Sequence, residues 1–380
     1  MIDIDKIASH AEAILSEIKG STVPPAEEPP VVTVPPAEEP PVVTVPPVTA
    51  PPVVGGAVAK SVSDILNMTK PGAIVYVRKG NLGSLVFNGI SAAGATIIPE
   101  DPSDPANFSD VSVLKSFGFC LSGFSVVPSI GAKMASVQKY LVKTDAASAH
   151  IIFKDLDIKA RDDADDFTNW TKADWTAWAW SGIQFLGKQN LAQGCKMTGV
   201  NFGFSTLADE AYVAGNTVFG FTGDAYRING NNCVVVKNRG TDSHTVNSNH
   251  CDLFQSFKKL PNGTYQAMVG NLYEDNVGIE WTVRRNNPLR EKLQGFGMYN
   301  GLMDGIIMRR NHVETTSYTG VTINSGKNCI IEDNYFGNVD KVVADCGRFK
   351  VAGTGNQVHR NQAPKFIGTY DSTNVKKPFQ

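Results

Sequence analysis

The segment NNCVVVKNRG, residues 231–240, is a short alternating strand that ends in an asparagine, and its pattern returns along the chain. Successive copies are about 23 to 38 residues apart, a variable spacing that is typical of a β-solenoid, in which each coil keeps its strands and varies its loops. A β-propeller would need about 40 residues and four strands per repeat. The other copies are GCKMTGVNFGF (194–204), GNLYEDNVG (270–278), GIIMRRNHVE (305–314) and KNCIIEDNYFG (327–337).

Asparagine recurs at one point of each predicted coil, where stacked side-chain amides can donate to and accept from one another. We therefore expect the amides of the aligned residues to form a ladder along the solenoid. These residues are Asn201, Asn238, Asn276, Asn311 and Asn334. Cysteines take matching places at the start of three repeats and are expected to be buried core residues. These are Cys195, Cys233 and Cys329. All six cysteines lack CxxC spacing, which predicts free thiols and disfavours a zinc site.

From about residue 58 to 370 the sequence resembles the right-handed parallel β-helix proteins of the pectate-lyase-like superfamily. The segment SVSDILNMTKPGAIVYVRKG, residues 61–80, is similar to the usual entry of that family: a capping helix, then Lys-Pro-Gly and a strand. The resemblance implies an all-β fold, a right-handed parallel β-helix, over residues 58–380. It indicates a fold and not a reaction. The paired Asp-Asp, Gly-His-Gly and Arg-x-Lys motifs of polygalacturonases are missing, which argues against a pectin hydrolase.

Two different segments precede the predicted solenoid. Residues 1–20 hold a helix whose apolar residues follow the a/d spacing of a coiled coil, and isoleucine at both positions favours trimers. This helix is predicted to oligomerise or to anchor the chain; the alternative is a helix packed on its own domain. Residues 21–57 repeat VPPAEEPPVVT at 23–33 and 34–44, which predicts a polyproline II linker rather than a ligand for an SH3-type domain.

The overall composition limits the partners of this protein. With 35 basic against 37 acidic residues, the net charge is -2, and no basic cluster indicates nucleic acid as a partner. The start of the chain has neither the basic nor the apolar region of a signal peptide, and no apolar run is long enough to cross a bilayer. We therefore expect neither export through a signal peptide nor membrane insertion.

The segment TDSHTVNSNHCDLFQSF, residues 241–257, is the first candidate for chemistry. Laid under residues 275–296, the stretch 237–257 pairs Asp242 with Glu280 and Gln255 with Gln294, and brings Asp252 near Glu291. Outward carboxylates one strand apart would raise one pKa and give a protonated acid beside an ionised base or nucleophile, as in glycosidases. The alternatives are sugar binding without cleavage and a solvated surface. The predicted catalytic residues are Asp242, Glu280, His244 and Asp252.

A loop rich in tryptophan, RDDADDFTNWTKADWTAWAWSG (161–182), is the second candidate. Flat aromatic faces suit pyranose rings, although the same tryptophans could instead pack inward or into a subunit interface. Asp242, Glu280 and Arg284 could also be arranged for a calcium-assisted lyase, but we predict neither a metal site nor a cofactor. The predicted substrate-binding residues are His250, Glu291, Arg284, Trp170, Trp175 and Trp178.

The order of anchor, linker and β-helix resembles bacteriophage spike and fibre proteins. This resemblance implies a homotrimer, made in the host cytoplasm, that attaches to a virion structural protein through residues 1–20. Its β-helix would bind bacterial surface polysaccharide and, if it is an enzyme, would depolymerise it as a glycoside hydrolase rather than a lyase. The alternatives are a non-catalytic adhesive fibre and a free-standing polysaccharide lyase or hydrolase, which the lack of a signal peptide disfavours.

Overall fold

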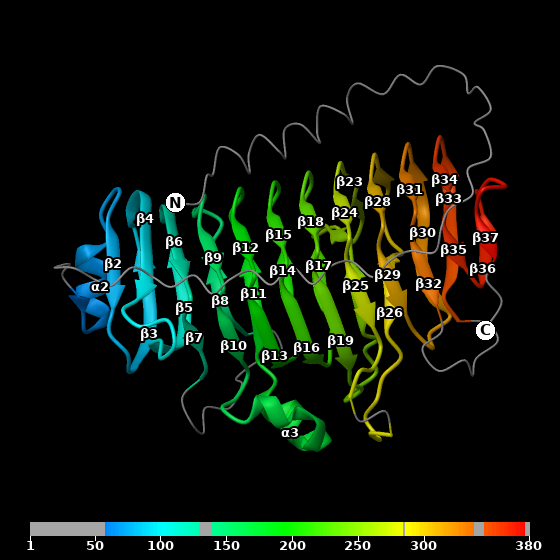
Figure 1. Ribbon diagram of the computed structural model, residues 1–380. Coiled ribbons are helices and arrows are strands. Elements are labelled where there is room, and N and C mark those ends of the chain that lie inside the picture. The colour runs from blue at the N-terminus through cyan, green and yellow to red at the C-terminus, as the bar shows by residue number, and fades with distance from the viewer. Residues whose placement is uncertain (1–57, 129–138, 284–285, 338–345, 377–380) are drawn as a thin grey trace, which may run out of the picture. The chain divides into compact units, whose positions relative to one another are not determined.

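The central strand of the quoted segment, β18 (Val234–Val236), pairs in parallel with one strand before it and one after it in the sequence. Its neighbours are β15 (Tyr212–Ala214) and β24 (Leu272–Glu274). Parallel neighbours this far apart in sequence require the chain to make one complete turn between them. The chain is therefore a right-handed parallel β-helix, as predicted (Figure 1). The structure is a computed structural model, and it describes residues 58–128, 139–283, 286–337 and 346–376. The predicted N-terminal helix and polyproline linker lie outside the described residues.

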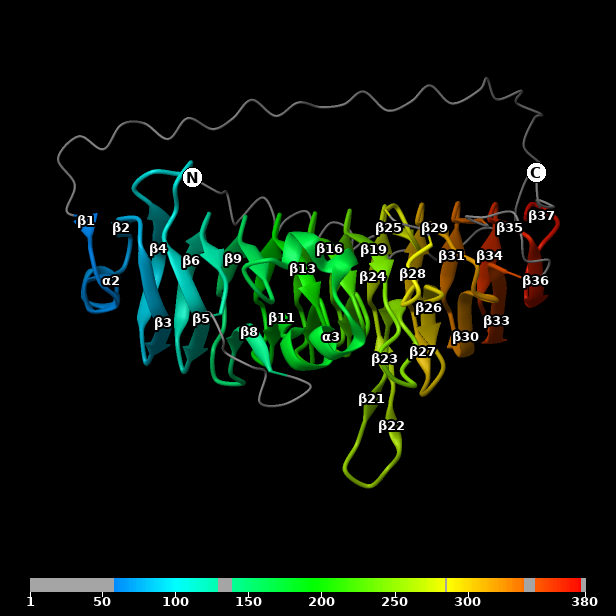
Figure 2. The ribbon, with the colours of Figure 1, turned by 90° about the horizontal axis from the view of Figure 1, so that it is seen from below.

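Each full coil contributes one strand to each of three parallel stacks, named here sheets 1, 2 and 3 (Figures 1 and 2). Sheet 1 holds β15, β18, β24 and β1 (Val58–Ala59), β2 (Ile74–Val77), β4 (Ser91–Pro99), β6 (Phe117–Ser122), β9 (Ile152–Lys154), β12 (Leu191–Gln193), β28 (Ile307–Arg309), β31 (Ile330–Glu332) and β34 (Gln357–His359).

Sheets 2 and 3 are joined through the pairing of β5 with β7. Sheet 2 holds β7 (Ser125–Val126), β10 (Asp157–Lys159), β13 (Lys196–Val200), β16 (Thr217–Phe221), β19 (Arg239–Ser243), β25 (Val277–Ile279), β29 (His312–Glu314), β32 (Tyr335–Gly337), β35 (Gln362–Ala363) and β37 (Val375–Lys376). Sheet 3 holds β3 (Asn81–Asn88), β5 (Asn107–Leu114), β8 (Tyr140–Thr144), β11 (Ser181–Phe185), β14 (Phe204–Thr206), β17 (Tyr226–Ile228), β20 (Asp252–Gln255), β26 (Gln294–Met298), β30 (Thr319–Lys327), β33 (Arg348–Thr354) and β36 (Lys365–Gly368).

The remaining elements lie at one end or on the sides of the β-helix. Helix α2 (Val62–Met68) lies at the N-terminal end of the stack and buries Ile65, as expected for a cap (Figure 1). A short 3-10 helix, η1 (Ala164–Asn169), and helix α3 (Lys172–Trp178) form the tryptophan-rich loop. Strands β21 (Lys258–Lys259) and β22 (Tyr265–Gln266) form an antiparallel hairpin that projects from the body (Figure 2), while β23 (Met268–Val269) pairs with β27 (Met303–Asp304). No helix of the described ranges could span a bilayer.

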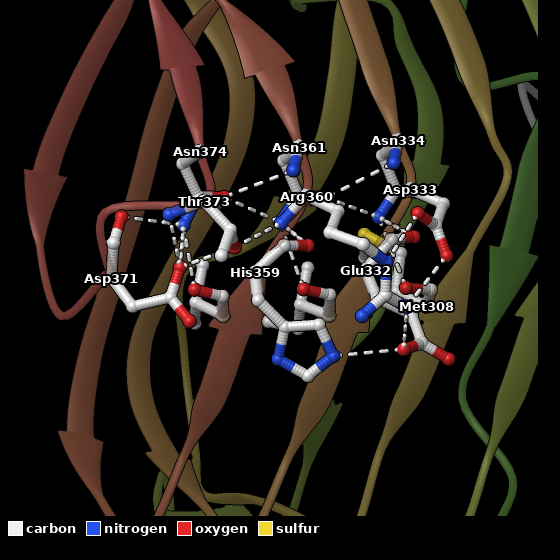
Figure 3. Close-up of polar contacts among 12 residues, drawn as sticks. Met308, Glu332, Asp333, Asn334, His359, Arg360, Asn361, Asp371, Thr373 and Asn374 are labelled. Atoms are coloured by element: carbon white, nitrogen blue, oxygen red, sulfur yellow. Dashed lines mark hydrogen bonds and ion pairs between the residues drawn. The ribbon is translucent and has the colours of Figure 1, made fainter. Parts of the chain in front are cut away.

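The predicted asparagine ladder is confirmed and runs along the corner between sheets 1 and 2. The Nδ2 of Asn276, for example, donates to the Oδ1 of Asn311 at 2.9 Å, and Asn276 accepts from Asn238 at 3.1 Å. Figure 3 shows the last rungs of the ladder. Each rung also satisfies backbone groups that would otherwise be buried without partners. The full ladder is Asn216, Asn238, Asn276, Asn311, Asn334, Asn361 and Asn374.

Asn201 was wrongly assigned to this ladder. The ladder residue before Asn238 is Asn216. The Oδ1 of Asn216 accepts from the N–H of Cys195 at 2.9 Å, so Cys195 lies at the same corner one coil earlier. Asn201 lies at the end of β13 instead, where its Oδ1 accepts from the hydroxyl of Thr222. The segment 194–204 therefore contains a corner and a strand of sheet 2, whereas the other aligned segments begin in sheet 1.

All six cysteines are buried free thiols, which confirms the prediction that they belong to the core. Burial raises the pKa of Cys195 and of Cys233 to about 12, so neither thiol is reactive near neutral pH. Cys233 and Cys329 precede equivalent strands of sheet 1, as predicted. Cys195 does not match them, because it follows β12 and precedes β13 of sheet 2.

Candidate functional site

The first half of the predicted alignment between coils is confirmed, and the second half is wrong. Gly240 pairs with Gly278, and the N–H of Asp242 donates to the carbonyl of Glu280 at 3.1 Å. Beyond this point Asp252, and not Gln255, pairs with Gln294. The segment from Glu280 to Gln294 is four residues longer than the segment from Asp242 to Asp252, so the partner of Gln294 lies three residues before the predicted Gln255.

Asp242 does not face solvent, contrary to the prediction. Its side chain is fully buried, and its backbone has a φ of 66°, which turns the side chain out of the alternation of a regular strand. The carboxylate accepts hydrogen bonds from the N–H and hydroxyl of Thr282, at 2.7 and 2.6 Å, and from the N–H of Val283 at 3.1 Å. Asp242 thus fixes the start of the loop that follows Glu280.

The Glu280 side chain is 1% exposed, so the prediction that it faces outward is also wrong. One carboxylate oxygen accepts from the Arg290 Nη2 at 2.7 Å. The other accepts from the N–H of Thr316 at 2.6 Å and from the hydroxyl of Thr315 at 3.0 Å. With its acceptors occupied in this way, Glu280 ties the loop through Arg290 to the turn at residues 315–317 and gives no support to a catalytic role.

His244 lies in an aromatic cluster and not on a solvated strand face. Its ring centroid lies 4.6 Å from that of Trp175, 4.8 Å from that of Trp281 and 5.3 Å from that of Phe167. The Nδ1 contacts the carbonyl of Asp242 at 2.9 Å and must therefore carry the hydrogen. Burial lowers the pKa of His244 to about 3, so the ring is neutral at physiological pH.

The predicted substrate-binding residues are scattered. Trp170 and Trp175 are buried against each other, with ring centroids 4.9 Å apart, so they pack inward and offer no platform to a sugar. Trp178 is partly exposed and lies 5.4 Å from the guanidinium of Arg161. His250 is exposed and Glu291 partly exposed, but Glu291 lies beside Ser243, to which its N–H donates, and does not pair with Asp252. Arg284 lies outside the described residues.

Asp252 belongs to a different acidic pair, formed with Asp224 on the preceding coil. Both residues lie where the chain turns from sheet 2 into sheet 3, and the N–H of Asp252 donates to the Oδ1 of Asp224 at 3.1 Å. Each carboxylate has a partner three residues later. Arg227 contacts Asp224 at 2.6 Å, and the amide of Gln255 donates to Asp252 at 2.9 Å. Arg227 and Gln255 are themselves in register on neighbouring strands.

The two carboxyl groups differ in their tendency to hold a proton. Burial raises the pKa of Asp252 well above its ordinary value, and the nearby charge of Asp224 raises it further. Burial also raises the pKa of Asp224, but the positive charge of Arg227 opposes that shift. Because the two groups interact, they titrate as a pair. The cation beside Asp224 favours the state in which Asp252 is protonated and Asp224 is ionised.

A glycine on the next coil makes room for the Asp252 side chain. A Cβ at Gly297 would lie 2.8 Å from the Oδ1 of Asp252 and 2.7 Å from the Cε2 of Tyr299. The space that a side chain would fill is therefore taken by the carboxyl of Asp252 and the ring of Tyr299, whose hydroxyl donates to Gln294. The Oδ1 of Asp252 makes no hydrogen bond within the described residues, so it is a buried polar atom without a partner.

A row of polar side chains on sheet 3 passes directly beside this pair. The strand registers place one residue from each of eight successive strands in line, and most of these residues are partly exposed. We name this set the outward row: Lys143, Gln184, Ser205, Arg227, Gln255, Gly297, Thr322 and Lys350. The row reaches the buried acidic pair through Arg227 and Gln255, which bind the two carboxylates.

No protein-family model and no curated protein sequence matches this chain. Solved structures with a similar path of the chain include an alginate lyase from Paenibacillus sp. str. FPU-7, with a TM-score of 0.49 and 12% identity over 83% of this chain and 98% of that chain. A GH136 lacto-N-biosidase from Eubacterium ramulus has a TM-score of 0.45 and 10% identity, over 83% and 63% of the two chains. The catalytic domain of a GH87 α-1,3-glucanase, in complex with nigerose, has a TM-score of 0.42 and 13% identity, over 86% and 70%. Similarity at this level defines neither a reaction nor a substrate for this chain.

Proposed function

We propose that this β-helix binds a polysaccharide along the outward row and cleaves it by glycoside hydrolysis at Asp252 and Asp224. The observation that carries the proposal is the acidic pair: two carboxyl groups on successive coils, one with a cation beside it and one with an unpartnered oxygen. Pairs of acids whose surroundings favour different protonation states are the usual basis of acid and base roles in glycosidases.

In this mechanism the protonated Asp252 gives its proton to the glycosidic oxygen while the bond to the anomeric carbon breaks. The ionised Asp224, held by Arg227, stabilises the positive charge on the sugar and takes a proton from the water that adds to it. Tyr299 and Gln255 lie against Asp252, so the substrate must displace one of these side chains to reach the carboxyl group.

The proposal includes attachment to a bacteriophage particle, with bacterial surface polysaccharide as the ligand. Its support is the order of the predicted anchor, linker and β-helix along the chain. In this arrangement residues 1–20 bind a virion structural protein, and the chains associate as a homotrimer after synthesis in the host cytoplasm.

The second candidate function is glycan binding without cleavage, as in an adhesive fibre. The observation that favours it is the burial of both acids, since Asp224 is 0% and Asp252 1% exposed. Hydrolysis needs contact between the acid and the glycosidic oxygen, whereas binding along the outward row does not.

Reducing-end release from capsular and exopolysaccharides tests the proposal. The wild-type chain should release reducing ends without the absorbance of unsaturated uronides, which would instead indicate elimination. Asp252→Asn and Asp224→Asn should each lower the rate by at least about 100-fold. Asp304→Asn removes a surface ion pair with Lys327 and serves as the matched control. Binding without release of reducing ends would favour the second candidate.

A further inference from the structure

Tyr318 is an aromatic residue that is neither buried in the core nor part of the acidic pair. It exposes 60% of its surface, more than any other large apolar side chain among the described residues. An aromatic ring in contact with water loses the hydrophobic stabilisation that burial would give it. The flat face of a tyrosine ring can cover apolar surface of a ligand while its hydroxyl stays in contact with water.

The structure holds Tyr318 in place on both sides of the chain. Its carbonyl accepts from the N–H of Arg348 on the next coil at 2.8 Å, which fixes the backbone at the start of β30. The Arg348 guanidinium lies 5.7 Å from the ring centroid and supports it by a cation–π contact. Two residues earlier, Thr316 is bound to the buried carboxylate of Glu280. These contacts fix the backbone at Tyr318 and place a cation beside its ring.

Tyr318 also stands close to the acidic pair. The next residue, Thr319, begins the strand that pairs with β26, and β26 pairs with the strand of Asp252. Two strand spacings separate Tyr318 from Asp252, which amounts to about 10 Å along the axis of the β-helix. Tyr299 follows the strand between them, and its hydroxyl donates to Gln294, which is in register with Asp252.

We propose that Tyr318, supported by Arg348, is a binding platform for a pyranose ring of the glycan, about two coils away from the bond that is cleaved. The apolar C–H face of the sugar packs on the tyrosine ring. The guanidinium of Arg348 donates to hydroxyl or carboxylate oxygens at the edge of the sugar. This inference rests on the proposed function only in taking a polysaccharide as the ligand; it does not depend on catalysis.

The test compares binding and cleavage by the full chain on an array of bacterial capsular polysaccharides and exopolysaccharides. Binding is measured by affinity electrophoresis and cleavage by reducing-end release. Tyr318→Ala should weaken binding about tenfold. Tyr318→Trp, which keeps a flat face, should retain most of the affinity. Tyr370→Ala is the control, since Tyr370 is 43% exposed but packs on Phe366 after β36, far from Asp252.

The outcomes separate the two proposals. Cleavage by the wild-type chain with unchanged binding by Tyr318→Ala overturns the platform and leaves the proposed hydrolysis intact. Weaker binding by Tyr318→Ala, with no cleavage by the wild-type chain, supports the platform and contradicts the hydrolysis. Equal losses in Tyr318→Ala and Tyr370→Ala contradict a specific platform. Absence of binding to every polysaccharide in the array contradicts both proposals.

Discussion

The backbone N–H of Asp252 donates to the carboxylate of Asp224 across two neighbouring coils, at 3.1 Å. Between these residues the chain makes one complete turn through β17, β18 and β19, and it returns to sheet 3 one coil later. The same contact orients the Asp224 carboxylate between a backbone donor and Arg227. The acidic pair is therefore a product of the solenoid architecture, and its chemistry can be tested residue by residue.

Gly297→Ala should slow cleavage in a folded protein. Gly297 does not have a positive φ, so the backbone tolerates alanine, but the new Cβ would lie 2.8 Å from the Oδ1 of Asp252 and 2.7 Å from Tyr299. One of these two side chains must move. Reducing-end release should fall by at least about tenfold, since small displacements of reacting groups are costly. Asp304→Asn, which removes a surface ion pair with Lys327 outside the outward row, should keep its activity. Full activity of Gly297→Ala would show that this packing is not needed.

His244 should make the protein sensitive to acid. Its pKa is lowered from 6.5 to about 3 by burial, so the unfolded chain binds the proton more readily than the folded chain between these pH values. Stability is therefore fully present above pH 6.5 and is lost as the pH falls towards 3. From pH 7.5 to 5 the contribution should fall by about 2 kcal/mol, measured by urea denaturation.

His244→Phe should remove this part of the pH dependence and keep the aromatic packing. Trp281→Phe changes the same cluster without removing a titratable group, so it should lower stability equally at both pH values. A His244→Phe variant with the wild-type pH dependence would show that the buried imidazole does not cause the acid sensitivity.

Glu280→Gln should destabilise the protein by about 3 to 5 kcal/mol, because it removes the buried negative charge that pairs with the guanidinium of Arg290 at 2.7 Å. Thermal and urea denaturation measure the change. Asp275→Asn breaks an ion pair with Arg310 that is much more exposed, and should cost less than about 1 kcal/mol. A Glu280→Gln variant of normal stability and reduced cleavage would instead restore Glu280 as a candidate catalytic residue.

Asn276→Ala should be more damaging than the same change at the end of the asparagine ladder. Asn276 donates to Val235 and Asn311 and accepts from Asn238, so its loss leaves several buried groups unpaired, at about 1 to 3 kcal/mol each. Asn374 is the last rung and is less buried, so Asn374→Ala should cost less. Equal urea midpoints for the two variants would contradict a cooperative ladder.

The fold could be predicted from the sequence because its main signal is local. From Asn216 onwards each coil has an asparagine at this corner, after an apolar strand, so the local pattern is kept whatever the length of the loops. The error at Asn201 arose where Cys195 replaces the asparagine and hides the corner. The coil with Asn216 was then missed, and with it Asp224, although TGDAYR (222–227) lies between two recognised repeats.

The candidate site could be predicted only in part, because it depends on loop lengths and on backbone conformations that no repeat pattern encodes. The longer loop after Glu280 shifted the register and paired Asp252 with the wrong coil. The positive φ of Asp242 broke the alternation that was expected to expose its side chain. Asp252 remains from the predicted cluster, with a different acidic partner. The predictions for residues 1–57, which include trimer formation and attachment, lie outside the described residues.

The most direct measurement is a crystal structure of the Asp252→Asn variant with a bound oligosaccharide from a polysaccharide that the wild-type chain binds. The amide keeps the shape of the carboxyl group but cannot give up a proton, so an intact ligand should stay in place. We expect sugar units along the outward row, and a glycosidic oxygen within hydrogen-bond distance of the substituted side chain, at about 2.6 to 3.2 Å. An oligosaccharide on another face, with the substituted side chain and Asp224 still covered by Tyr299 and Gln255, would contradict the assignment of this pair as the catalytic site.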